Sequence, residues 1–189
     1  MEQMYLRTTL KKYVGGSPTP LEDVRPTLWN IPAQTSGTSA DDGRQQALIL
    51  EQYKLYVEMA DRISGRRSLT NTFFLTLNTA IFTVIATFWK PGRDGAAQLL
   101  FFPLVAVVVQ CGAWFFLVRS YRQLNSAKYT VIGVLEERLP ASPYWSAEWK
   151  ALGEGKDKSK YWPLTHLEQW VPVTFACTYV GGFIAVLLG

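Results

Sequence analysis

The stretch SLTNTFFLTLNTAIFTVIATFW, residues 68–89, decides the fold because it is long, uncharged and largely apolar. Two more such stretches follow, AAQLLFFPLVAVVVQCGAWFFLV at residues 96–118 and WVPVTFACTYVGGFIAVLLG at residues 170–189. At about 1.5 Å rise per residue, each can cross a hydrocarbon core roughly 30 Å thick as a helix. Soluble domains rarely need helices that are apolar on every face. The sequence therefore predicts an all-α membrane protein.

The first two stretches are joined by residues 90–95, where Pro91-Gly92 is typical of a tight turn. They are expected to form a transmembrane hairpin over residues 68–118. The third stretch, residues 170–189, has Pro172 where a first helical turn tolerates it, but Gly181-Gly182 weakens a helix that stands alone. Glycines are tolerated where helices pack closely in a membrane. We expect a third span, and a re-entrant or peripheral helix is the alternative.

The distribution of lysine and arginine predicts the orientation. Basic residues gather before the first span, after the second and before the third: Arg62, Arg66, Arg67, Arg119, Arg122, Lys128, Lys156, Lys158 and Lys160. The positive-inside rule places these segments in the cytoplasm. The N-terminus is then cytoplasmic, no signal-peptide core is present in residues 1–67, and Gly189 lies on the outer face. We expect a multi-pass protein of the cytoplasmic membrane.

The segments outside the spans are expected to be mostly helical. Residues 1–40 carry Pro18, Pro20, Pro26 and Pro32 and are predicted to be an irregular tail. Residues 41–67 are predicted to form a cytoplasmic amphipathic helix that opens at a Ser39 cap and continues into the first span. Its apolar face consists of Ile49, Tyr53, Tyr56, Ala60 and Ile63.

Residues 119–169 are predicted to be a cytoplasmic helical region. A second amphipathic face consists of Tyr121, Leu124, Lys128, Val131 and Leu135, and it ends near Leu139-Pro140. Glu136 and Glu137 are interpreted as the solvated end of this helix. Ser142-Pro143 is expected to cap a short helix through Leu152, residues 153–160 to be a linker, and Thr165 and Glu168 to form a capping box before the third span.

Composition agrees with a small membrane protein that has aqueous parts. Hydrophobic residues make up 48% and aromatic residues 14%, and Trp89, Trp162 and Trp170 lie near the ends of spans, where tryptophan anchors helices at the lipid boundary. The net charge of +4 suits contact with anionic membrane lipids. The basic residues form no stripe of the kind that binds nucleic acid, so we expect no nucleic-acid partner.

The first span contains regularly spaced polar residues. Threonines recur at three- and four-residue spacing, and two asparagines seven residues apart are expected to flank the same helical face: Thr72, Thr76, Thr79, Thr83, Thr87, Asn71 and Asn78. Gln98 and Gln110 lie on the second span. Unsatisfied amides are unfavourable in lipid, so this face should meet protein or water. The two readings are helix packing with oligomerisation, which we favour, and the lining of a pore or ligand cavity.

The residues favour no enzyme class. His166 is the only histidine, and no spacing of metal ligands or phosphate loop is present, so neither a metal site nor a cofactor site is expected. Cys111 and Cys177 lie within spans, where small buried packing residues are favoured over a redox pair. No Asp, Glu, Lys or Arg lies inside a span, which disfavours a proton relay or ion-coupled transporter.

Two motifs flank the hairpin, YKLYVEMADRISGRR at residues 53–67 and SYRQLNSAKY at residues 120–129. With them, residues 45–189 resemble the RipA-type small bacterial inner-membrane proteins, which are described as octameric. More loosely, the chain is similar to the two-span SLATT proteins of bacterial conflict systems, which are proposed to form pores. The resemblance implies a homo-octamer in a bacterial inner membrane.

The resemblance also draws attention to a possible cytoplasmic collar at the span ends, formed by Arg62, Arg66, Arg67, Arg119, Arg122 and Asn125. These residues serve either as anchors to lipid headgroups or as contacts between subunits, with an arginine bonding Glu58 or Asp61 of a neighbour. We expect a non-enzymatic oligomer in membrane or envelope homeostasis or stress adaptation. The alternative is a pore-forming defence effector gated from the cytoplasm, and no cytoplasmic regulator can be named from the sequence.

Overall fold

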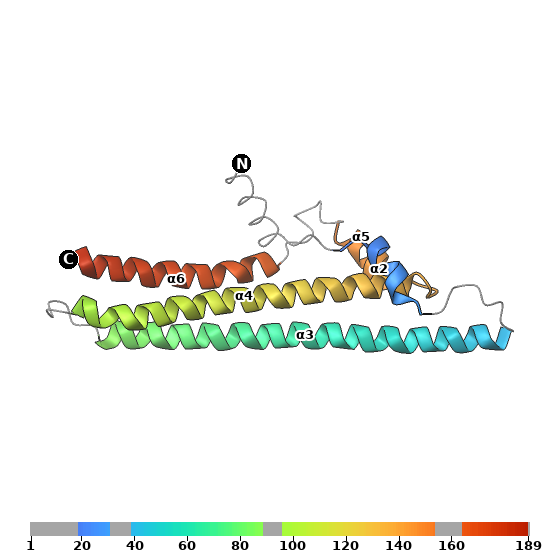
Figure 1. Cartoon of the computed structure of the whole chain (residues 1–189), viewed down its shortest axis with the longest axis horizontal. Coiled ribbons are helices and arrows are strands. Elements are labelled where there is room, and N and C mark those ends of the chain that lie inside the picture. The colour runs from blue at the N-terminus through green and yellow to red at the C-terminus, as the bar shows by residue number, and fades with distance from the viewer. Residues whose placement is uncertain (1–18, 31–38, 89–95, 154–163, 189) are drawn as a thin grey trace. The chain divides into compact units, whose positions relative to one another are not determined.

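The computed structural model describes residues 19–30, 39–88, 96–153 and 164–188, and it is helical throughout these ranges apart from short turns. The elements are α2 (Leu21–Leu28), α3 (Ser39–Phe88), α4 (Ala96–Glu136), the π-helix η1 (Pro143–Glu148), α5 (Trp149–Ala151) and α6 (Leu164–Leu188) (Figure 1). Three of them, α3, α4 and α6, are long and apolar enough to cross a membrane. The prediction of an all-α membrane protein is confirmed.

Helices α3 and α4 each run through two compact units. The first unit contains α2, α3 up to Arg62, and the chain from Gln123 through η1 and α5. The second contains α3 from Ile63, α4 up to Arg122, and α6. Because Gly65 lies in an uninterrupted helix, the amphipathic segment and the first apolar stretch form one continuous α3.

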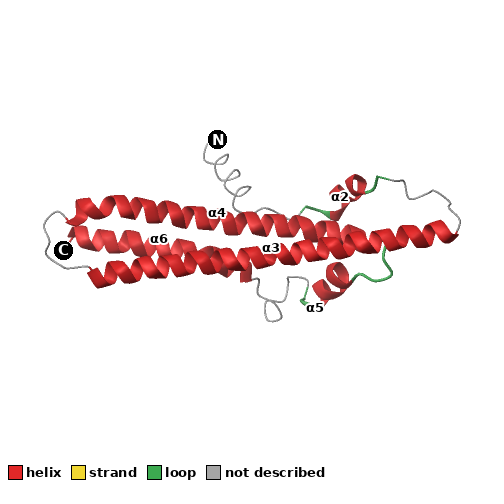
Figure 2. Cartoon of the chain, turned by 90° about the horizontal axis from the view of Figure 1, so that it is seen from below, coloured by secondary structure: helices red, strands yellow, loops and turns green. Residues whose placement is uncertain are grey.

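The two long helices are antiparallel within each unit. In the first unit, the Lys128 ammonium lies 4.9 Å from the centre of the Tyr56 ring, and the Tyr53 hydroxyl donates to Glu136 at 3.1 Å. In the second, Trp114 of α4 bonds Asn71 of α3, and Cys111 bonds Asn78. The residue numbers rise along α3 as they fall along α4, as the hairpin requires. Figure 2 shows α6 beside these helices in the second unit.

Burial follows the predicted apolar face of residues 41–67. Ile49, Ala60 and Ile63 are buried, and Tyr53 and Tyr56 are half-buried. The face predicted for residues 121–135 is only partly right, because Leu124 is exposed whereas Leu135 is buried. Near the end of α4, residues on every side are buried because other segments of the same unit cover it: Thr130, Ile132, Gly133, Val134, Leu135 and Glu136.

Helix α2 corrects the expectation of an irregular tail. Pro20 precedes its first residue, where a missing N–H is tolerated, and Glu22 and Asp23 lie in its first turn, where the helix dipole favours acidic groups. Pro26 lies inside the helix. The prolines therefore do not prevent a short helix, and α2 is further held by contacts to the end of α4.

Proline positions in the spans also differ from expectation. Helix α6 begins at Leu164, so Pro172 lies in its interior rather than in its first turn, and Thr165 is inside the helix rather than at its cap. Pro103 is likewise inside α4. Membrane helices tolerate interior prolines when neighbouring groups satisfy the freed backbone atoms. Pro172 is buried, and α6 continues through Gly181 and Gly182.

Several predictions lie outside the described residues. These are the Pro91-Gly92 turn, the anchors Trp89 and Trp162, most of the 153–160 linker, and the tail at residues 1–18 and 31–38. The side chains of Ser39, Gln98, Thr165 and His166 also lie outside the description.

Candidate functional site

Asn78 joins the three helices of the second unit. It is 0% exposed. Its side-chain Nδ2 donates to the Phe74 carbonyl at 2.8 Å, and its Oδ1 accepts from the Cys111 thiol of α4 at 3.6 Å. Its backbone carbonyl accepts from the Tyr179 hydroxyl of α6 at 2.9 Å. The polar groups of this residue are thus satisfied within one chain, and Asn78 is closed off from any lumen.

Asn71 makes a second polar contact between α3 and α4. Its Oδ1 accepts from the Trp114 indole nitrogen at 2.9 Å, and Trp114 is 1% exposed. The Trp114 ring stacks on Phe74, with centroids 5.6 Å apart, and tilts against Phe175 of α6 at 6.2 Å. A buried indole N–H requires a hydrogen-bond acceptor. The asparagine supplies this acceptor and lets the tryptophan pack between the helices.

The threonines of α3 lie on a different face from the asparagines. They are exposed, and the hydroxyls of Thr72, Thr79, Thr83 and Thr87 donate to carbonyls four residues earlier in the same helix, at 2.8–3.1 Å. Thr76 is exposed as well. Consecutive helical residues are about 100° apart, which separates Asn71 from Thr72. The asparagines therefore flank the threonine row as expected, but only the asparagines lie on the packed side of α3.

The remaining polar residues of the spans divide between interior and surface. Gln110 is half-buried, and its Nε2 has no hydrogen-bond partner within the described ranges. Cys111 is buried, as predicted for a packing residue, whereas Cys177 is exposed, and both are free thiols. The expectation that both cysteines are buried is thus right for only one of them.

The arginines of the predicted collar make contacts within the chain. In the first unit, Arg62 pairs with Glu58, one turn earlier on α3, at 2.7 Å. In the second, the Arg67 Nε lies 3.4 Å from Glu168 of α6. Glu58 therefore already has an intrachain partner, and Glu168 contacts Arg67 of α3.

The other collar residues vary in exposure. Arg66 is exposed, and Arg119, Arg122 and Asn125 are half-buried. The ion pairs found among the described residues do not include Arg66, Arg119 or Arg122.

Glu136 is the most constrained charged residue in the described chain, and sequence reasoning missed it. The interpretation of Glu136 as a solvated helix end is wrong because its side chain is 2% exposed. One carboxylate oxygen accepts from the Tyr53 hydroxyl at 3.1 Å and the Tyr144 N–H at 3.1 Å. The other accepts from the Ser142 hydroxyl at 2.6 Å and the Trp145 N–H at 2.9 Å. Four donors therefore match the roughly four lone-pair positions of a carboxylate.

The prediction for Ser142 is right in position, because Ser142 is the N-cap of η1 and Pro143 is its first residue, but the side chain has another partner. The Ser142 side chain makes no cap bond to η1, because its hydroxyl donates to Glu136 instead. Trp145 packs so closely against α4 that a Cβ on Gly133 would lie 2.8 Å from its ring carbons. A sequence signal existed, since Glu136 follows Leu135 and lies four residues after Ile132, on the side of the helix that is buried.

The two residues that follow α4 contact α2 and its C-cap residue. Glu137 accepts two hydrogen bonds from Arg25, from Nε at 2.9 Å and from Nη2 at 2.7 Å, and these bonds hold the pKa of Glu137 below its ordinary value. The guanidinium of Arg138 lies 3.4 Å from the centre of the Trp29 ring. Glu136, Glu137 and Arg138 thus each bind another segment, so the end of α4 is an attachment point in the first unit.

The described residues contain no group of three or more His, Cys, Asp or Glu that could hold a metal ion. The polar groups of the arrangement connect segments of the chain. Asparagines of α3 bond α4 and α6, the threonines of α3 are exposed, and the buried Glu136 carboxylate binds residues 142–145 to the end of α4.

The model of the octameric membrane protein family (8xMP) matches residues 50–188, which include α4, η1, α5, α6 and most of α3. No curated protein and no solved structure matches the chain significantly. The chain belongs to the octameric membrane protein family, and the octameric membrane protein expected from the two motifs is thereby confirmed.

Proposed function

We propose that this member of the family is a non-enzymatic subunit of a homo-octamer in a bacterial cytoplasmic membrane, with a role in membrane or envelope homeostasis or stress adaptation. The octamer and the membrane follow from the family. The cellular role is the one that the resemblance to RipA-type proteins implies, and the properties of the spans support a structural role over coupled transport.

The observation that carries the proposal is the use of polar groups inside the spans. Asn71 and Asn78 bond Trp114 and Tyr179 of neighbouring helices in the same chain, and Asn78 has no exposed surface. No ionisable Asp, Glu, Lys or Arg lies in residues 68–88, 96–118 or 170–188. Transporters and proton pumps place such groups along their pathways. The interior of this three-helix unit is better suited to a structural role than to coupled transport.

The proposed orientation has a cytoplasmic N-terminus. Arg62, Arg66 and Arg67 on α3 and Arg119 and Arg122 on α4 follow the positive-inside rule if the segments carrying them face the cytoplasm. Reporters fused to each end test this proposal. An active cytoplasmic reporter at the N-terminus and an active periplasmic reporter at the C-terminus support it. Both ends on one side would contradict a third crossing by α6.

One observation favours a second function, a pore-forming effector. The threonine stripe of α3 is exposed, and each bonded hydroxyl retains acceptor capacity that could face water. The same stripe also suits close packing of subunits, because small residues let helices approach each other in membranes. Under the structural proposal, the threonine stripe packs against a neighbouring subunit.

Controlled expression and reconstitution separate the two functions. If the homeostatic proposal is right, induction leaves the membrane potential unchanged, and deleting the gene makes cells sensitive to envelope stress. The purified oligomer in liposomes should then pass no ions. Depolarisation on induction, together with ion flux that is lost when Thr79 and Thr83 are replaced by valine, would support the effector instead.

A further inference from the structure

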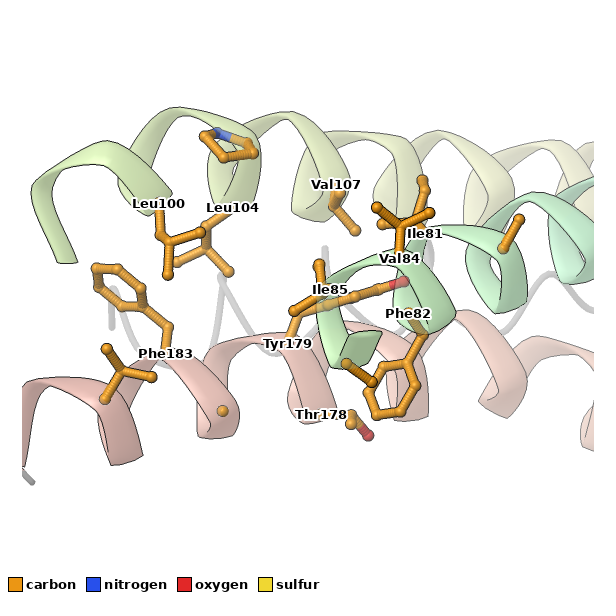
Figure 3. A pocket seen from close by; sticks show the side chains of 15 residues that line it. Ile81, Phe82, Val84, Ile85, Leu100, Leu104, Val107, Thr178, Tyr179 and Phe183 are labelled. Atoms are coloured by element: carbon orange, nitrogen blue, oxygen red, sulfur yellow. The ribbon is translucent and has the colours of Figure 1, made fainter. Parts of the chain in front are cut away.

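The second unit contains an apolar pocket between its three helices, near the ends of α3 and α6 and the start of α4. Its volume is about 650 Å³. Figure 3 shows Leu104 and Val107 of α4 and Tyr179 and Phe183 of α6 projecting into the space between the helices, with Ile81 and Ile85 of α3 beside them. Each of the three spans therefore contributes to the wall.

The wall offers almost nothing to a polar ligand. The Tyr179 hydroxyl, although its ring lines the pocket, donates to the Asn78 carbonyl at 2.9 Å. The Thr178 hydroxyl donates to the Thr174 carbonyl in its own helix at 2.9 Å. The rest of the lining is aliphatic, aromatic or glycine. Water needs two to four polar partners to occupy a cavity, so a pocket of this kind excludes it.

The pocket opens to the outside of the helices. Val84 and Phe82 line it and are 56% and 46% exposed. Gly182 lines it from α6, and a Cβ built on Gly182 would have no atom within 4 Å. Since the pocket lies within the three membrane-length helices, its opening faces an apolar medium, either the hydrocarbon of the bilayer or a neighbouring subunit.

The size of the pocket distinguishes between two apolar occupants. An apolar cavity of about 150 Å³ accommodates benzene, so the present volume corresponds to roughly four such molecules, or about 26 carbon atoms. One side chain from a neighbouring subunit would leave most of this space empty, and a whole helix is about 10 Å wide. A flexible hydrocarbon chain is slender enough to enter and long enough to fill much of the space. We propose that one acyl chain of a membrane lipid occupies this pocket.

Adjacent glycines provide a matched pair of variants. Gly182 lines the pocket, whereas Gly181 does not, and neither would place a Cβ within 4 Å of another atom. Replacing either by leucine raises helix propensity by a similar amount. Gly182→Leu places a branched side chain in the pocket and narrows the path of an acyl chain, and Gly181→Leu is the control. Circular dichroism and size-exclusion elution show whether both variants fold and assemble like the wild type.

The test uses the full-length protein in liposomes that contain phosphatidylcholine with a diazirine in the middle of one acyl chain. After irradiation, mass spectrometry locates the labelled residues. Labelling of Leu104 and Tyr179 should fall severalfold in Gly182→Leu and stay at the wild-type level in Gly181→Leu. Phe102, which is 77% exposed and outside the pocket lining, should be labelled equally in all three proteins and serves as the internal reference.

The proposal would be overturned if the ratio of Leu104 labelling to Phe102 labelling were the same in wild type and Gly182→Leu. Such a result would mean that Leu104 is labelled by the surrounding bilayer and not by a chain in the pocket. A second experiment does not depend on filling the pocket. The photo-crosslinking amino acid p-benzoylphenylalanine at Val84, on the exposed rim, should form a lipid adduct. A covalent dimer of the chain in place of that adduct would identify a second subunit as the occupant and overturn the proposal.

Discussion

Replacing Glu136 by alanine should release residues 142–145 from the end of α4. The wild-type carboxylate accepts hydrogen bonds from the Ser142 hydroxyl at 2.6 Å, the Trp145 N–H at 2.9 Å, and the Tyr53 hydroxyl and Tyr144 N–H at 3.1 Å each. A hydrogen bond to a charged group contributes about 1.5–3 kcal/mol, and an unmatched buried donor costs about 1–3 kcal/mol. These contributions are not additive, because the segment can open and expose its donors to water. The expected loss is about 3–5 kcal/mol, as for other broken buried charge networks.

Amide hydrogen exchange measures this loss where it occurs. The N–H groups of Tyr144 and Trp145 both donate to the Glu136 carboxylate, so their exchange reports on its removal directly. A loss of about 3 kcal/mol should accelerate their exchange by roughly a hundredfold, since each 1.4 kcal/mol is a factor of ten. The measurement is made on protein in lipid nanodiscs, with the middle of α3 as the unaffected reference.

Glu137→Ala is the matched control because it removes the adjacent carboxylate, whose ion pair with Arg25 is exposed. Exposed ion pairs stabilise a fold only slightly, so exchange at Tyr144 and Trp145 should change less than about fivefold. Exchange at Tyr144 and Trp145 in Glu136→Gln should be faster than in Glu137→Ala and slower than in Glu136→Ala. The glutamine amide retains one oxygen acceptor, but its NH₂ group faces donors of the segment. Equal exchange in Glu136→Ala and Glu137→Ala would refute the argument that the buried carboxylate holds this segment.

Three further predictions concern the other contacts. Gly133→Ala should destabilise the first unit by about 1–3 kcal/mol in urea unfolding, although alanine favours helices, because the new Cβ would lie 2.8 Å from the Trp145 ring; an unchanged midpoint would show that the ring moves freely. Asn71→Leu and Trp114→Phe should each destabilise the subunit, and their double-mutant cycle should give a coupling of about 0.6–2 kcal/mol, whereas additive effects would contradict the bond between them. Because Arg25 lowers the pKa of Glu137, this pair stabilises the docking of α2 above the ordinary carboxyl pKa of 4.5, and the contribution is lost as the pH falls through the lower folded-state pKa. Exchange protection of α2 should therefore decrease below pH 4.5 in the wild type, and Arg25→Gln should lower protection at neutral pH and make it less dependent on acid.

Much of the fold could be predicted from the sequence because the bilayer restricts the choices so strongly. Residues 68–89, 96–118 and 170–189 are long and uncharged. In hydrocarbon, a helix satisfies the hydrogen bonds of the backbone within each such stretch. The three-residue and four-residue spacing of Ile49, Tyr53, Tyr56, Ala60 and Ile63 likewise identified a face of α3, on which Ile49, Ala60 and Ile63 are buried. These features depend on local sequence and on the surrounding medium, so they can be read one segment at a time.

The candidate site was only partly predictable, because a polar side chain can be satisfied in several ways. The spacing of Asn71, Asn78 and the threonines showed that the first span carries polar groups, but it did not show which would find partners. Asn71 meets Trp114, 43 residues away in the sequence, and Asn78 meets Tyr179, 101 residues away. The threonines instead bond their own helix. Only the packing of α4 and α6 against α3 decides between these outcomes.

Glu136 shows most clearly the difference between what the sequence predicts and what the packing of the chain decides. By sequence, a glutamate followed by Glu137 and Arg138 at the end of an amphipathic helix is best solvated, because burying a lone carboxylate costs several kcal/mol. In the folded chain, Tyr53 approaches from α3, and Ser142, Tyr144 and Trp145 turn back onto the end of α4. The sequence by itself determined that this chain is helical and enters a membrane, since those properties follow from the polarity of contiguous residues. The tertiary structure decided which polar groups are buried, because burial becomes favourable only when donors from distant segments converge on one acceptor.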